Sequence, residues 1–210
     1  MRAAHEIPFV GLTGAIAAGK SEALAALARL GAATLSTDAV VHDLLETERV
    51  RDLLVGRWGG EVAPHGRVDR SRVGAIVFER PEELEWLEAE LHPLVAERVG
   101  AWGERLPEGT RLAVVEVPLL FETGMDAIFD ATICVVAPEA TRAERAGSRG
   151  AAGLDGRNAR QLSQEEKARR ATFVLRNDGT LEDLEAALAA ILPQLEAWPE
   201  RAAGGRGPAG

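Results

Sequence analysis

The sequence reads Gly14-Ala15-Ile16-Ala17-Ala18-Gly19-Lys20-Ser21 near its N-terminus, which fits the pattern G-x-x-x-x-G-K-[ST]. In this pattern backbone N–H groups surround the phosphates of a nucleotide, and the two glycines allow a close approach that a Cβ would obstruct. Lys20 brings a positive charge to the β- and γ-phosphates, and the Ser21 hydroxyl is suited to bind Mg²⁺. The alternative is a Gly/Ala-rich turn before an ordinary helix. We interpret residues 14–21 as a phosphate-binding loop, called the phosphate loop below.

The segments on either side of the phosphate loop place it between a strand and a helix. Residues 7–12 form a short apolar run that suits a buried parallel strand. Residues 22–30 are rich in strong helix formers, with leucines at regular helical spacing. Such a helix directs the positive end of its dipole at a bound anion. The sequence therefore predicts an α/β fold in which a parallel sheet carries a phosphate site.

Composition and charge limit the function classes. The chain has 210 residues, of which 46% are hydrophobic and 27% charged, as in a globular protein that buries a core. Its net charge of −9 argues against a general nucleic-acid-binding surface. Cys134 is the single cysteine, no apolar stretch has membrane length, and the N-terminus lacks a signal-peptide pattern. We expect a soluble, cytoplasmic protein, a monomer or weak homo-oligomer, without nucleic-acid or membrane partners.

A second strand is predicted at residues 32–36, ending at Thr37-Asp38. A helix follows, capped by Thr37 or Asp38. In an open parallel sheet, ligands bind beyond the carboxyl ends of the strands, so the Asp38 carboxylate is a candidate to face the γ-phosphate. The alternative is that Asp38 serves only as a helix cap.

Residues 49–108 differ from the flanking segments. They hold three tryptophans and leucines in helical register, and they show no strand of the parallel-sheet kind. His92-Pro93 is expected to interrupt the second half of this region. We interpret residues 49–108 as a mostly helical insertion that binds a second substrate.

Two apolar runs after the insertion predict further buried strands. The first, within residues 112–122, ends at Pro118 because proline cannot donate to the ladder. Glu116 interrupts this run, as the acid of a Walker B strand does near Mg²⁺; alternatively, it is a strand-end or edge carboxylate facing water. The second run is residues 131–136, and residues 173–175 predict a last strand before a final amphipathic helix.

Residues 141–170 form the most basic segment, with glycines in its middle. In a fold that transfers phosphoryl groups, such a segment predicts a lid that closes over the phosphates. The alternative is a pair of solvated, charged helices joined by a loose loop. The predicted domains are a nucleotide-binding core at residues 1–48 and 109–200 that contains this lid, the insertion at 49–108, and a disordered tail at 201–210.

Several segments together resemble the dephospho-coenzyme A kinase family. The glycine-rich stretch alone fits many families, whereas the P-L-L-F-E signature with the His-Pro pair and the C-terminal block is specific. The likeness covers roughly residues 9–192. The segments that carry it are residues 11–21, Asp38, residues 77–83, residues 91–94, P-L-L-F-E at residues 118–122, Gln161, Lys167 and residues 173–177.

This resemblance implies a P-loop NTPase three-layer α/β fold with a parallel sheet, a helical substrate-binding insertion and a basic lid. It also implies transfer of the γ-phosphoryl group of ATP, with Mg²⁺, to the ribose 3′-hydroxyl of dephospho-CoA. The other reading is a different small-molecule P-loop kinase that acts on a nucleoside or nucleotide. A regulatory GTPase would need an N-K-x-D-type motif, which the sequence lacks.

The resemblance also assigns site residues. Asp38 is expected to accept the proton of the attacking hydroxyl or to contact Mg²⁺ indirectly, and Ser21 is the metal ligand. Glu122 is expected to orient backbone or substrate, and His92 either binds substrate or is a structural residue at a helix end. The catalytic candidates are Lys20, Asp38, Arg145 and Arg149, and the substrate-binding candidates are Thr13, Asp38, His92, Pro118, Leu119 and Glu122.

The sequence departs from the family pattern at several places, including the lid, which is about three residues shorter between Arg149 and Gln161 than the resemblance implies. Ser36 stands where the family usually has an acid, and Ala171-Thr172 replaces Ala-Asp before the last strand. Ala15 and Ala17 replace two glycines of the phosphate loop. Alanine is tolerated there if the backbone φ angle is negative, which is therefore the expected conformation.

Overall fold

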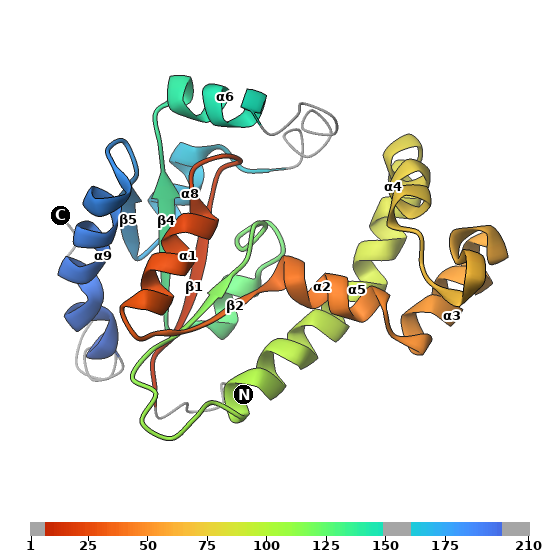
Figure 1. Ribbon diagram of the computed structural model, residues 1–210, viewed down its shortest axis with the longest axis horizontal. Helices are drawn as coiled ribbons and strands as arrows, with labels where there is room; N and C mark the ends of the chain where they lie inside the picture. The colour runs from red at the N-terminus through yellow and green to blue at the C-terminus, as the bar shows by residue number, and fades with distance from the viewer. Residues whose placement is uncertain (1–6, 149–160, 199–210) are drawn as a thin grey trace. The chain divides into compact units, whose positions relative to one another are not determined.

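Five strands form one sheet in the order β2-β3-β1-β4-β5 (Figure 1). In the computed structural model, residues 7–148 and 161–198 are described. β1 lies in the middle and pairs in parallel with β3 and β4, and β4 pairs in parallel with β5. The strands are β1 (Phe9–Gly14), β2 (Ala33–Ser36), β3 (Ala113–Glu116), β4 (Ala131–Val136) and β5 (Phe173–Arg176). The predicted parallel sheet is confirmed.

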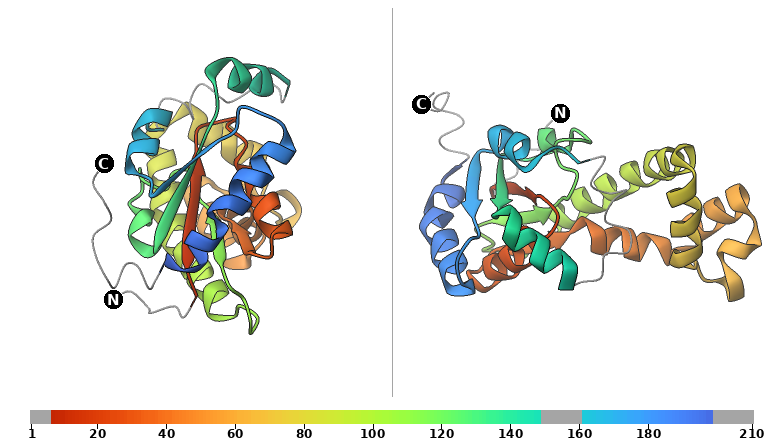
Figure 2. Two further views of the ribbon diagram at one scale, coloured as in Figure 1. Left: turned by 90° about the vertical axis from the view of Figure 1, so that its left-hand side faces the viewer. Right: turned by 90° about the horizontal axis from the view of Figure 1, so that it is seen from above.

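Helices cover both faces of this sheet, which makes the predicted three-layer fold (Figure 2). α1 (Lys20–Arg29) and α9 (Leu181–Glu196) pack together on one face, and α8 (Gln164–Arg170) packs against β1 and β4 on the other. In the chain, β4 is preceded by a 3₁₀ turn, η3 (Met125–Ile128), and followed by α6 (Glu139–Ser148).

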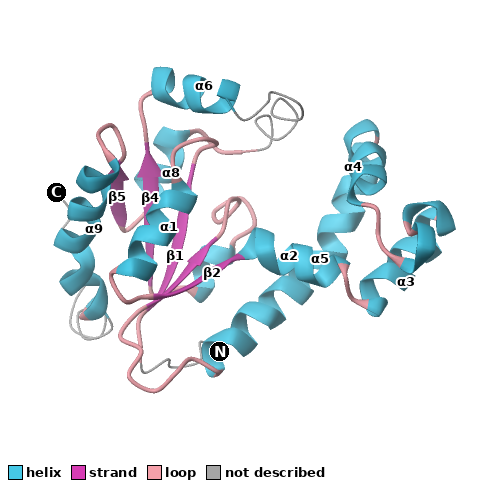
Figure 3. Cartoon of the chain, viewed as in Figure 1, coloured by secondary structure: helices cyan, strands magenta, loops and turns pink. Residues whose placement is uncertain are grey.

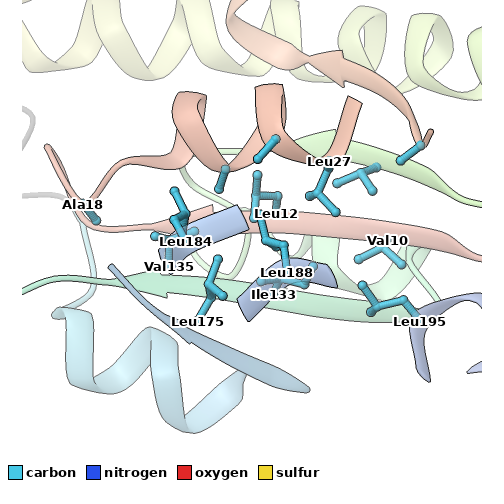
Figure 4. Close-up of a cluster of buried hydrophobic side chains, with 14 of the residues drawn as sticks. Val10, Leu12, Ala18, Leu27, Ile133, Val135, Leu175, Leu184, Leu188 and Leu195 are labelled. Carbon is cyan, nitrogen blue, oxygen red and sulfur yellow. The ribbon is translucent and has the colours of Figure 1, made fainter. Parts of the chain in front are cut away.

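The core of the sheet lies between the central strands and the α1 and α9 helices (Figure 4). Strands buried on both faces read as nearly continuous apolar runs, which is why β1 and β4 were visible in the sequence. Fully buried side chains from four elements meet here: Val10, Leu12, Leu27, Ile133, Val135, Leu184 and Leu188. No helix in the described part of the chain is long and apolar enough to cross a membrane.

The chain divides into two compact units, residues 36–104 and the remainder. The first unit is entirely helical (Figure 3). Its boundary precedes the predicted start of the insertion at residue 49, because α2 packs against α5 within this unit. Its elements are α2 (Thr37–Leu45), α3 (Glu48–Trp58), η1 (Gly60–Val62), η2 (Pro64–Gly66), α4 (Arg70–Glu79) and α5 (Pro81–Glu104).

Two details of this helical unit differ from the sequence prediction. α5 continues through Pro93 instead of ending at it. A proline inside a helix costs about 3 kcal/mol, and burial of Leu91 and Leu94 on either side offsets this at about 1.5–3 kcal/mol each. In α2 the capping residue is Ser36, not Thr37 or Asp38. Ser36 ends β2 with an extended backbone, so the helix begins at the very next residue.

A buried carboxylate joins α3 to α5 in the helical unit. Glu83 accepts hydrogen bonds from Arg57 at 2.9 and 3.2 Å and from the indole N–H of Trp58 at 2.8 Å. Trp58 also makes an edge contact with Trp86, over which the Arg57 guanidinium lies. The hydrogen bonds from Arg57, followed by that from Trp58, hold the pKa of Glu83 below its ordinary value.

Glu83→Gln is therefore expected to lower the melting temperature by several degrees at neutral pH. It should also change how the free energy of unfolding depends on pH in the acid range. The folded-state pKa is depressed, so the contribution of Glu83 is complete above its ordinary value of 4.5 and is lost as pH falls through the lower folded-state value. Tryptophan fluorescence during acid titration measures this, and the variant should show a shallower loss below pH 4.5. Glu82→Gln, at the exposed neighbouring position, is the control. Equal acid profiles for all three proteins would contradict the assignment.

Candidate functional site

The phosphate loop connects the end of β1 to the start of α1. A Cβ on Gly14 would collide with the backbone oxygen of Val135 in β4. A Cβ on Gly19 would collide with the Asn177 side chain, and Gly19 also has a φ of 97°. Both positions therefore require glycine. At Gly14 the reason is the close backbone of β4, and at Gly19 it is the close Asn177 side chain together with the left-handed backbone.

Lys20 lies across this loop. Its ammonium donates to the carbonyl oxygens of Gly14 at 3.2 Å and Ala15 at 3.1 Å. Lys20 also begins α1, whose first N–H groups have no partner within the helix. Ser21 is exposed in the same first turn. The loop thus presents a helix N-terminus, an ammonium and an accessible hydroxyl, which is the chemistry that binds phosphate.

Ala17 contradicts the expected backbone conformation. Its φ is 61°, in the left-handed region, where the sequence analysis required a negative value. Cβ sterics make this conformation cost about 1–2 kcal/mol for a residue other than glycine. Ala17 lies in the loop between β1 and α1, so the strain is local to the phosphate loop.

Ala17→Gly is expected to stabilise the ligand-free protein by about 1 kcal/mol, or roughly 2–4 °C in melting temperature. The gain from removing the left-handed strain exceeds the added freedom of the unfolded chain. Ala18→Gly is the matched control, because Ala18 is fully buried and has no positive φ. That variant should be less stable than the wild type. A melting curve in which the two substitutions act alike would remove the strain argument.

Two side chains reach the phosphate loop from distant parts of the sequence. Asn177, just after β5, donates from its amide to the Ala18 carbonyl at 2.8 Å and is buried. Arg145 of α6 is half-buried, and its Nη1 would lie 3.6 Å from a Cβ on Gly19. Arg145 was a catalytic candidate from the sequence, whereas Asn177 was quoted as the end of the C-terminal block and was not among the predicted site residues. A polar residue at the end of a predicted parallel strand was the available signal.

A pocket of about 190 Å³ adjoins the phosphate loop. The loop contributes Ala15 and Ile16, α6 contributes Arg142, and the other wall is residues 161–165. The Nε atom of Arg142 is buried and has no hydrogen-bond partner among the described residues. The pKa of Glu165 lies below its ordinary value, chiefly because of hydrogen bonds from its own backbone and from the Ser163 side chain. The positive charge of Arg142 also lowers this pKa. The pocket therefore places a guanidinium beside the loop that binds phosphate.

The P-L-L-F-E segment contacts residues beside the phosphate loop and in the pocket wall. Thr13 is fully buried, and its hydroxyl donates to the Pro118 carbonyl at 3.3 Å. Glu122 forms an ion pair with Lys167 at 3.0 Å and accepts from the Leu162 backbone N–H at 2.9 Å. Lys167 was expected within the basic lid or, in the alternative, within a pair of solvated, charged helices. It is instead fully buried, because α8 packs against the sheet.

Glu116 ends β3, which lies between β2 and β1. Its side chain is buried, at 6% exposure, and its Cα partner in β1 is Leu12. The alternative of an edge carboxylate facing water is therefore wrong. A contact between Glu116 and Mg²⁺ stays a prediction.

Cys134 lies in β4 opposite Thr13. Burial raises the pKa of its thiol to about 11, against the opposing effect of the Lys167 and Lys20 charges. The thiol is therefore protonated at neutral pH, and Cys134 is a core residue rather than a nucleophile.

The family model for dephospho-CoA kinase (CoaE) matches residues 8–183, a range that includes the phosphate loop, the P-L-L-F-E segment and Asn177. The chain belongs to the dephospho-CoA kinase family. A dephospho-CoA kinase of Thermus thermophilus is 38% identical over 208 residues, which are 98% of each chain. A dephospho-CoA kinase of Deinococcus radiodurans is 41% identical over 191 residues, covering 89% of this chain and 92% of the relative.

Two solved structures have a similar fold. The crystal structure of TT1252 from Thermus thermophilus is similar with a TM-score of 0.75 and 38% identity, covering 90% of this chain and 98% of that one. A dephospho-CoA kinase from Campylobacter jejuni, at 23% identity, has a TM-score of 0.63 over 90% of this chain and 97% of its own, and it shares the fold.

The remaining residues that the dephospho-CoA kinase resemblance assigned are placed as follows. Asp38 is exposed in the first turn of α2, and His92 is half-buried within α5, not at a helix end. Pro118 and Leu119 are half-buried. Arg149, most of the predicted lid loop and the predicted disordered tail lie outside the described residues.

Proposed function

We propose that this protein transfers the γ-phosphoryl group of ATP to the ribose 3′-hydroxyl of dephospho-CoA, giving coenzyme A and ADP. The observation that carries the proposal is the phosphate loop, in which two obligatory glycines, Gly14 and Gly19, precede Lys20 at the start of α1. Membership of the dephospho-CoA kinase family directs this general phosphate chemistry to one acceptor. Phosphoryl transfer needs charge neutralisation, in-line positioning and a proton acceptor.

Neutralisation of the transferring charge is assigned to three groups. The loop amides and the Lys20 ammonium bind the β- and γ-phosphates. The Arg145 guanidinium, beside Gly19, stabilises the charge that develops on the transferring group. Arg142, with its buried Nε, lines the adjoining pocket and adds positive potential there. A role for Arg149 stays a prediction.

Magnesium fits the residues at the loop. Mg²⁺ prefers oxygen ligands and keeps several waters, so it is commonly held by one or two protein groups together with substrate phosphates. The exposed Ser21 hydroxyl, in the first turn of α1, is such a group. When bound, the ion neutralises the negative charge shared by the β- and γ-phosphates.

The acceptor side of the reaction is assigned to the helical unit. Asp38, with its exposed carboxylate, takes the proton of the attacking 3′-hydroxyl. His92 and the helices around it contribute to binding dephospho-CoA. The support of the phosphate loop and of the pocket wall is assigned to Thr13, Pro118, Leu119 and Glu122. Thr13 donates to the Pro118 carbonyl, and Glu122 accepts from the Leu162 backbone N–H. We further propose that the protein acts in the cytoplasm; its oligomeric state stays a prediction.

A coupled assay tests the proposal. ADP release is followed with ATP–Mg²⁺ and dephospho-CoA, with adenosine and AMP as alternative acceptors. Rapid turnover with dephospho-CoA alone, and a product that co-elutes with coenzyme A rather than with its 2′-phosphate isomer, is the expected result. Faster turnover with adenosine or AMP would instead support a nucleoside or nucleotide kinase of the same fold.

A further inference from the structure

Lys167 is the most deeply buried charged side chain that the structure describes, with an exposure of 0%. Its ammonium pairs with Glu122 Oε1 at 3.0 Å and donates to the Pro118 carbonyl at 2.6 Å. A buried ammonium is costly unless a partner of opposite charge and further hydrogen bonds compensate for the lost water. Both of these partners belong to the P-L-L-F-E segment.

The Glu122 carboxylate has few other partners. Oε1 accepts from the Leu162 backbone N–H at 2.9 Å. Oε2 is buried without a hydrogen-bond partner among the described residues. If the Lys167 charge were removed, the carboxylate would keep only the Leu162 amide. Lys167 is therefore the group that fixes Glu122, and through it the backbone of Leu162.

The same contacts reach the phosphate loop. The Pro118 carbonyl accepts from Lys167 and from the Thr13 hydroxyl, using both of its lone pairs. Thr13 immediately precedes Gly14. On the other side, Leu162 belongs to the pocket wall that faces Ala15 and Ile16. One ammonium thus connects the strand end before the phosphate loop to the wall across the pocket from that loop.

We propose that Lys167 is a positioning residue for phosphoryl transfer, which sets the pocket wall at residues 161–165 relative to the phosphate loop. This inference rests on the proposed function, because it assigns Lys167 a part in that reaction. Lys167 is fully buried, so it acts through Pro118, Glu122 and Leu162. Misplacement of reacting groups by about 1 Å costs up to roughly 10²-fold in rate, so a link of this kind affects turnover more than nucleotide binding.

A pair of substitutions separates positioning from stability. Lys167→Met leaves a buried carboxylate without its charge partner, so it is expected to lower the melting temperature and kcat together. The double variant Lys167→Met with Glu122→Met replaces the ion pair with apolar groups of similar length, an exchange that often restores stability. Arg170→Met, which removes an exposed ion pair with Glu166 on the same helix, is the matched control and should leave both values unchanged.

The expected result is a double variant whose melting temperature returns close to that of the wild type while kcat stays about 10- to 100-fold lower and KM for ATP changes little. Recovery of kcat along with the melting temperature would overturn the proposal, because it would show a merely structural ion pair. A near-normal kcat in the Lys167→Met variant would overturn it as well. If the single variant does not fold, the double variant still decides.

Hydrogen exchange gives a readout that does not depend on the acceptor. ATP–Mg²⁺ added to the wild type should slow amide exchange in peptides covering residues 14–21 and 161–167. In the double variant the protection at 14–21 should persist and that at 161–167 should be lost. Protection of both peptides in the double variant would contradict the link. A wild type that shows the coupled protection but does not phosphorylate dephospho-CoA would refute the proposed function and not this inference.

Discussion

Lys20→Ala is expected to lower kcat by about 10²–10³-fold and to weaken ATP binding as well, since one preorganised charge donor contributes on that scale. The Lys20 ammonium lies over the loop, where it donates to the carbonyls of Gly14 and Ala15. Both ground-state binding and charge stabilisation in the transition state depend on this ammonium, and both should fall.

The measurement pairs isothermal titration with ATP–Mg²⁺ and the coupled assay with dephospho-CoA. Arg29→Ala is the control, because Arg29 lies at the opposite end of α1 in an exposed ion pair with Glu185. That substitution changes the same net charge on the same helix, and surface pairs of this kind contribute little. If Lys20→Ala binds ATP as tightly as the control, the loop does not hold the triphosphate through Lys20.

The fold was predictable from the sequence because the strands β1, β3 and β4 are buried on both faces. Residues 131–136 read as one apolar run and are the β4 strand, and the run before the phosphate loop became β1. Pro93 shows where such patterns fail. The local cost of proline favours a helix end, but burial of the leucines on both sides keeps α5 continuous. A rule based on neighbouring residues alone does not include the free energy of that burial.

The site was predictable where its chemistry is local. The phosphate loop carries its glycines, lysine and serine in one stretch, so their spacing alone indicated a phosphate site. Asn177 and Lys167 reach the site across long sequence separations. Lys167 lies within a basic segment, and composition alone suggests that such a lysine is solvated. Only the packing of α8 on the sheet shows that it is buried.

The backbone of Ala17 could not be predicted for a different reason. A negative φ was the natural expectation for alanine, because its Cβ disfavours the left-handed region. Between β1 and α1 the φ angle of Ala17 is nevertheless 61°. The strain is small compared with the burial of the two elements that the turn joins, so the global fold determines the local angle.

Asp38→Asn is expected to lower kcat by at least about 10²-fold while leaving ATP affinity nearly unchanged, which is the scale of losing a general base. Asparagine keeps the size and hydrogen-bonding oxygen of the side chain but cannot accept the proton of the attacking hydroxyl. The substitution is at an exposed position in the first turn of α2, so it should not disturb packing. Because the loss concerns the chemical step, KM for dephospho-CoA should change far less than kcat.

Asp43→Asn provides the comparison, since Asp43 is exposed on the same helix and the change of charge is identical. Single-turnover measurements with both variants would separate the chemical step from product release. A general base predicts a slow chemical step only for Asp38→Asn. Equal kcat values for the two variants would mean that Asp38 takes no part in the chemical step, and that the proton acceptor must be sought elsewhere.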